Sequence, residues 1–122
     1  MKLRIKANSI RIRLTKTEVS KLATAGYVQE ETIFPGKTFI YALKTMNNVT
    51  TLTATFTDNQ ITMLVPQLFA TTWPQNEIVG IDAEMIVNEN KKLYLLLEKD
   101  FVCLDDSHED QSDNYDNPIK RR

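Results

Sequence analysis

The sequence predicts an α+β domain that is mainly antiparallel β, folded as a barrel-like or sandwich-like sheet with two short helices. Apolar and polar residues alternate over much of the 122-residue chain, as they do in strands that bury one face. Turn pairs such as Pro35-Gly36 and Asp58-Asn59 separate the alternating runs. The long crossover helices that a doubly wound parallel sheet needs are absent from the pattern, which favours antiparallel strands.

The first fourteen residues are predicted to form a β-hairpin. Their alternation changes phase at Ala7-Asn8, and a two-residue turn there explains the change. This register pairs Leu3 with Ile12 on one face and sets Arg4 opposite Arg11 on the other. Like charges directly opposite each other are destabilising, and an anion over that face would reverse the effect.

The remaining elements follow from caps, turns and alternation. Thr15 and Glu18 make a capping box that begins a helix over 16–25, and Gly26 ends it. We then expect strands over 27–34, 37–46, 51–57 and 61–65, a helix over 66–73, and a strand over 78–87. Residues 91–104 contain the longest apolar run, and we expect them to form a central strand that is buried on both faces.

A weak internal echo occurs at a spacing of 51 residues. Apolar positions of the first half, among them Ile10, Ile12 and Leu22, match Ile61, Met63 and Trp73. One interpretation is a pseudo-twofold repeat of strand, short helix and β-hairpin. The other is a coincidence between two strand–helix–strand patterns, because the halves share no rare residue.

Charge is distributed unevenly along a chain whose net charge is only −1. The predicted hairpin carries five bases on one side, the basic face: Lys2, Arg4, Lys6, Arg11 and Arg13. The far end carries acids and no base between 105 and 116, among them Asp105, Asp106, Glu109, Asp110 and Asp113. We therefore expect one β-rich domain over 1–104 and an acidic tail over 105–122 that packs on the basic face.

Other features narrow the functional class. No segment approaches the ~20 apolar residues of a membrane span, and the N-terminus lacks the apolar core of a secretory signal. Cys103 is the single cysteine, so no internal disulfide forms and a reducing cytoplasm is expected. Cys103 and His108 are weak metal candidates, since zinc sites want about four well-spaced ligands. We expect no cofactor and no metal.

Two stretches resemble a known family. Residues 1–6 (MKLRIK) with 8–15 (NSIRIRLT), and residues 98–105 (EKDFVCLD), resemble short bacterial proteins classed as a domain of unknown function. The resemblance extends over most of the chain because both ends fit. It implies no activity and assigns no site.

Three functional hypotheses remain. The first is a non-enzymatic cytoplasmic binding module, a homodimer or partner-binding protein, whose basic face engages an acidic segment of its own tail or of another chain. The second is binding of nucleic acid or another anion by the same face, although no aromatic residue is interleaved with the bases. The third is a metal-dependent or Cys/His hydrolase that uses Cys103 and His108.

Overall fold

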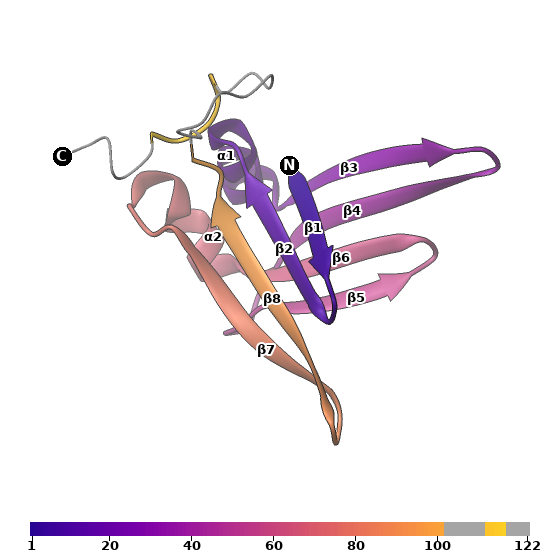
Figure 1. Cartoon of the computed structure of the whole chain (residues 1–122). Helices are drawn as coiled ribbons and strands as arrows, with labels where there is room; N and C mark the ends of the chain where they lie inside the picture. Colours follow the sequence, from indigo (N-terminus) through magenta and orange to yellow (C-terminus); the bar gives the residue numbers. More distant parts are fainter. Residues whose placement is uncertain (102–111, 117–122) are drawn as a thin grey trace.

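A computed structural model describes residues 1–101 and 112–116 of the chain (Figure 1). In this part of the chain the elements are β1 (Lys2–Lys6), β2 (Ser9–Leu14), α1 (Lys16–Ala25), β3 (Tyr27–Phe34), β4 (Lys37–Met46), β5 (Thr53–Thr57), β6 (Gln60–Pro66), α2 (Gln67–Thr72), a 3-10 turn η1 (Trp73–Gln75), β7 (Gly80–Asn88) and β8 (Lys91–Lys99). The predicted α+β class, rich in strands and with two short helices, is confirmed. Neither helix has the length or the apolar character of a membrane span within the described residues.

The strands form two four-stranded sheets, ordered β1-β2-β8-β7 and β3-β4-β6-β5. Neither sheet closes into a barrel, and the strands of the second sheet cross behind those of the first (Figure 1). Each sheet has two antiparallel hairpins joined by a parallel central pair, β2 with β8 and β4 with β6. Alternation alone did not indicate the parallel pairs, because they join strands that are distant in the chain.

The topology repeats with twofold organisation. Each half of the chain is hairpin, helix, hairpin, and each sheet takes the first hairpin of one half and the second hairpin of the other. Equivalent backbone bonds recur: Tyr94 N donates to Asn8 O, and Ile40 N donates to Asn59 O, both at 3.0 Å. The spacing between Asn8 and Asn59 is the 51 residues of the sequence echo.

The core lies between the two sheets and under the two helices, which pack against each other. It contains residues from every layer: Ile12, Leu14, Leu95 and Leu97 from the first sheet, Leu43, Met63 and Val65 from the second, and Leu22 and Trp73 from the helical segments. All nine side chains are at most 1% exposed, so one continuous core holds the interlocked halves together.

The N-terminal hairpin has the predicted register. Leu3 lies opposite Ile12 and Arg4 lies opposite Arg11. The turn places Ala7 at φ 48°, a left-handed conformation that is unfavourable for alanine. The register is therefore set by burial of the apolar face more than by the turn residues.

The prediction for residues 91–104 was partly wrong. β8 is a central strand, but it ends at Lys99, and residues 102–104 lie outside the described ranges. Leu95 and Leu97 are buried, whereas Tyr94 is 49% exposed on the opposite face. The core covers only one face of the first sheet, and the other face is the one that carries the bases of the hairpin.

Candidate anion-binding site

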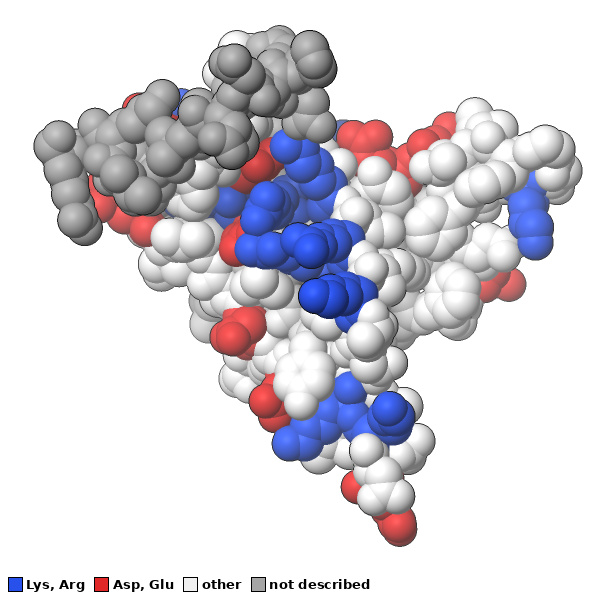
Figure 2. Space-filling view, in the orientation of Figure 1, with Lys and Arg blue, Asp and Glu red and all other residues white. Residues whose placement is uncertain are grey.

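The basic face lies on the outer side of the first sheet, over β1 and β2. Figure 2 shows a row of Lys and Arg side chains along these strands. Cross-strand pairing sets Lys2 opposite Arg13 and Arg4 opposite Arg11, while Lys6 lies opposite the neutral Ser9. Two cross-strand rows of like charge, Lys2 with Arg13 and Arg4 with Arg11, are thus brought together, as the sequence predicted. Each of these rows needs a counter-charge.

Glu98 provides most of that counter-charge. The parallel pairing of β2 with β8 sets Glu98 beside Arg13. Its Oε1 atom accepts a hydrogen bond from the Nε of Arg11 at 2.8 Å and from the Nε of Arg13 at 2.7 Å. The Glu98 side chain is only 14% exposed, so these charge-assisted bonds are partly shielded from water.

Asp100 provides the second carboxylate, one residue beyond the end of β8. Its Oδ2 atom lies 3.1 Å from the Nζ of Lys2, and its side chain is 5% exposed. Its backbone N–H donates to the carbonyl oxygen of Leu14 at 2.8 Å, which fixes the carboxylate at the end of β2. Within the described ranges, no carboxylate forms an ion pair with Arg4 or Lys6.

The side chains of Lys2, Arg4, Arg11 and Arg13 line a shallow hollow of about 170 Å³. Four cations line it, and among the residues that the structure describes two carboxylates, Glu98 and Asp100, pair with three of them; these six groups sum to a formal charge of +2. Such a hollow attracts carboxylate or phosphate groups, because the guanidinium and ammonium groups point N–H donors at them. It is the candidate site.

Sequence reasoning found the four cations and missed their internal partners. Alternation along 93–98 places Glu98 on the face opposite Leu95 and Leu97, and this was the available signal. The parallel neighbour of β2 could not be read from the sequence, because it comes from the other end of the chain.

The described part of the acidic tail does not lie on the basic face. Asp113 lies at the start of α1, where its carbonyl oxygen accepts from Lys16 N at 3.0 Å and its Oδ1 accepts from Thr17 Oγ1 at 3.1 Å. Hydrogen bonding to Thr15 and then to Thr17, together with the positive charge of Lys16, lowers the pKa of the Asp113 carboxyl. Asp113 therefore acts as an anion at a helix N-terminus.

The other predicted tail residues lie outside the described ranges: Asp105, Asp106, Glu109, Asp110, Cys103 and His108. Their packing on the basic face stays a prediction. Among the residues that the structure does describe, no three His, Cys, Asp or Glu side chains are grouped so that they could hold a metal ion.

Comparisons with known proteins give a family and no function. No curated protein and no solved structure matches this chain. One family model matches residues 1–119, which is nearly the whole length, as the two quoted stretches of sequence had suggested. The chain belongs to that family, DUF7009, a family of unknown function.

Proposed function

We propose that the chain is a non-catalytic, cytoplasmic binding module whose basic face engages an acidic protein segment. The observation that supports this is the hollow between Lys2, Arg4, Arg11 and Arg13, where the four cations exceed the two carboxylates of the described residues by a formal charge of +2. Two carboxylates of an acidic segment would neutralise it. An ion pair with an exposed cation contributes only ~0–1 kcal/mol, so affinity depends on several pairs forming together.

The chain's own acids are the nearest candidates for this segment. Residues 102–111 connect Phe101 to Ser112, and they start two residues after Asp100, which already contacts Lys2. A ten-residue segment that is held at both ends can extend outward by half its length, about five residues, which is about 17 Å at ~3.3–3.6 Å per residue. That reach exceeds the ~7 Å between alternate positions of a strand such as Lys2 and Arg4, so the acids can reach both rows of bases.

The experiment neutralises the tail and leaves its anchored part intact. The variant Asp105→Asn/Asp106→Asn/Glu109→Gln/Asp110→Asn retains Asp113 and Tyr115, which contact the folded domain. A matched control, Glu31→Gln/Asp58→Asn/Asp82→Asn/Glu89→Gln, removes the same charge from exposed positions elsewhere. Binding of a fluorescent heptaglutamate peptide and the melting temperature are measured for both variants at low and high salt.

If the tail occupies the basic face, its neutralisation lowers the melting temperature and raises peptide affinity, while the control does neither. If another chain supplies the segment, the unmodified protein and the variant with the neutralised tail bind the peptide equally well. In both cases Arg4→Gln/Arg11→Gln weakens peptide binding. Absence of peptide binding in all three proteins, with unchanged melting temperatures, contradicts the proposal.

A second candidate is single-stranded nucleic acid, and Tyr94 is the observation that favours it. Tyr94 of β8 is 49% exposed on the outer face of the first sheet. It pairs with Ser9 of β2, which is two residues before Arg11 in that strand. Proteins that bind single strands combine bases with aromatic rings on which nucleobases stack. A fifteen-residue oligothymidine that binds more tightly than heptaglutamate, and more weakly after Tyr94→Ala, would favour this candidate over the first.

A further inference from the structure

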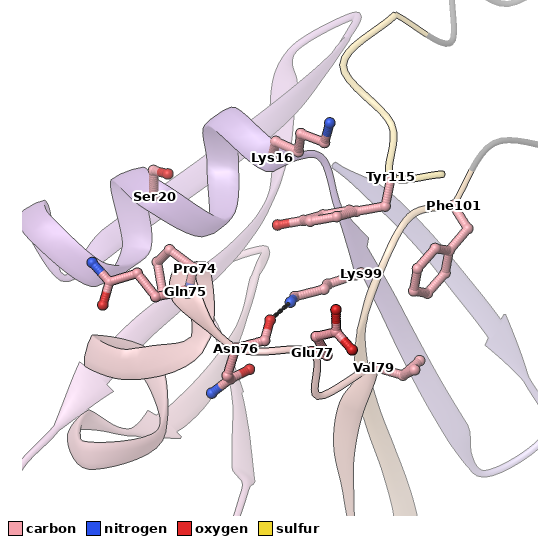
Figure 3. A pocket seen from close by; sticks show the side chains of 10 residues that line it. All are labelled: Lys16, Ser20, Pro74, Gln75, Asn76, Glu77, Val79, Lys99, Phe101 and Tyr115. Atoms are coloured by element: carbon pink, nitrogen blue, oxygen red, sulfur yellow. Dashed lines mark hydrogen bonds between the residues drawn. The ribbon is translucent and has the colours of Figure 1, made fainter. Parts of the chain in front are cut away.

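The second sheet ends in an open strand edge, β5. Among the described strands β5 pairs with β6 alone, so its other side faces away from the sheet. The edge differs in this from the cavity of about 560 Å³ between α1 and β8, where polar groups already contact each other: Lys99 Nζ donates to Asn76 O at 2.7 Å (Figure 3). An open edge can accept a strand of another chain. It belongs to the other sheet from the basic face, so the inference below does not rest on the proposed function.

The turn after β5 determines which backbone groups face the open side. Asp58-Asn59 has φ angles of 51° and 63°, as in a type I′ two-residue turn. The turn joins Thr57 and its partner in β6 as a hydrogen-bonded pair, and such pairs alternate along an antiparallel ladder. The N–H and C=O groups of Ala54 and Phe56 therefore point to the open side. No backbone hydrogen bond within the described residues reaches these four groups.

β5 is also uncharged, unlike the other three edge strands of the described sheets. β1 carries three bases, and β3 and β7 carry two acids each, whereas the five residues of β5 are threonine, alanine and phenylalanine. Charge on an edge strand hinders pairing with a second chain, and like charges directly opposite each other destabilise a sheet. Self-pairing would bring like charges together at β1, β3 or β7. At β5 it would not.

The sequence of β5 fits an antiparallel copy of itself. With a twofold axis at Thr55, Ala54 of each copy lies opposite Phe56 of the other, and these two pairs form four backbone hydrogen bonds. All the open groups of both residues are then used. On the outer face Thr55 lies opposite its own copy, and cross-strand pairs of threonine are favourable. On the core-side face the Phe56 ring, which is 68% exposed in the single chain, lies beside the small side chain of Ala54.

We propose that β5 is an interface between two copies of this chain, which pair edge to edge and join their second sheets into one continuous sheet. The joined sheet would have eight strands, within the ~2–10 strands that sheets usually contain. Its centre would be the Thr55 pair. The hydrogen bonds give the affinity, and the pairing of large Phe56 with small Ala54 on one face gives the register.

Analytical ultracentrifugation of the full chain from about 10 μM to about 1 mM measures the dimer. One strand and one exposed ring per copy make a small interface, so we expect a reversible dimer with a dissociation constant of about 10–500 μM. Phe56→Lys should raise this constant about tenfold or more, because it removes apolar burial and adds charge to the edge. The matched control is Phe34→Lys, which changes a 52% exposed ring on the same face of the sheet, in β3, and should leave the constant unchanged.

Two cysteine variants in a Cys103→Ser background test the register. At Thr55 the two Cα atoms would be about 4.5 Å apart across the axis, within the ~4.4–6.8 Å range of disulfides. Thr55→Cys should therefore give a covalent dimer on oxidation. Thr57→Cys lies opposite Thr53 of the second copy and should give little covalent dimer.

Three results would overturn the proposal. The first is a chain that stays monomeric over the whole concentration range, as expected if β5 accepts a strand of a different protein. The second is a dimer that Phe56→Lys and Phe34→Lys weaken equally. The third is equal cross-linking, or none, at the two cysteine positions.

Discussion

Replacement of Glu98 by glutamine tests whether an internal carboxylate holds the basic face together. The change keeps the shape of the side chain and removes its charge. Glu98 Oε1 accepts from the Nε atoms of Arg11 and Arg13 at 2.8 and 2.7 Å, and these two side chains are 32% and 38% exposed. Each partly exposed pair contributes up to ~1 kcal/mol, so the two together amount to ~1–2 kcal/mol.

A loss of this size is measurable by thermal unfolding. For a chain of 122 residues, 1 kcal/mol corresponds to roughly 4 °C in melting temperature, so we expect Glu98→Gln to lower it by about 4–8 °C at low salt. The difference should shrink in 0.5 M NaCl, where screening extends over only a few ångströms. Affinity for heptaglutamate should rise at the same time, because the formal charge of the hollow increases from +2 to +3.

Glu84→Gln is the matched control on the same sheet. Glu84 pairs with Lys92 at 3.1 Å, but both side chains are more than half exposed, so the free energy of unfolding should change by less than ~0.5 kcal/mol. An equal effect of the two substitutions, or a loss from Glu98→Gln that salt does not alter, would refute the role assigned to Glu98.

Three further outcomes follow from the geometry of the fold. Gly80→Ala should destabilise the protein by about 3 kcal/mol or more in denaturant unfolding, because a Cβ atom there would lie 2.2 Å from Leu97 O. Gly36→Ala, where the added atom meets open space but φ is +81°, should cost only ~1 kcal/mol, and equal losses would contradict the steric explanation. Thr15→Ala should cost ~1 kcal/mol by removing the capping hydroxyl of α1, with an unchanged unfolding midpoint as the contrary result. The folded-state pKa of Asp113 is below its ordinary 3.8, so its charge stabilises the fold above that pH, and this contribution is lost as pH falls through the folded-state pKa. Asp113→Asn should therefore make the melting temperature depend less on pH between about 5 and 2. An unchanged pH dependence in this range would contradict the prediction.

Local sequence signals predicted most of the elements. The phase change at Ala7-Asn8 predicted the hairpin register, and the capping box with Gly26 predicted α1 from Lys16 to Ala25. These signals act over a few residues, through burial of alternate side chains and satisfaction of the first backbone N–H groups of a helix. The 51-residue echo left a repeat and a coincidence open, and the structure has the same order of elements in both halves.

The candidate sites depended on contacts between distant parts of the chain. Sequence alone placed five cations on one face of a hairpin, and it proposed the acidic tail as their partner. The structure sets Glu98 and Asp100 against three of those cations, 85 or more residues away in the chain.

The sequence by itself therefore determined the strands, the helices and the charge of each face, because these follow from alternation and capping within short segments. Only the tertiary structure decided which strands are neighbours, and with them which charges meet. The parallel pairing of β2 with β8 depends on burial of one core shared by the two halves, and no local pattern encodes it.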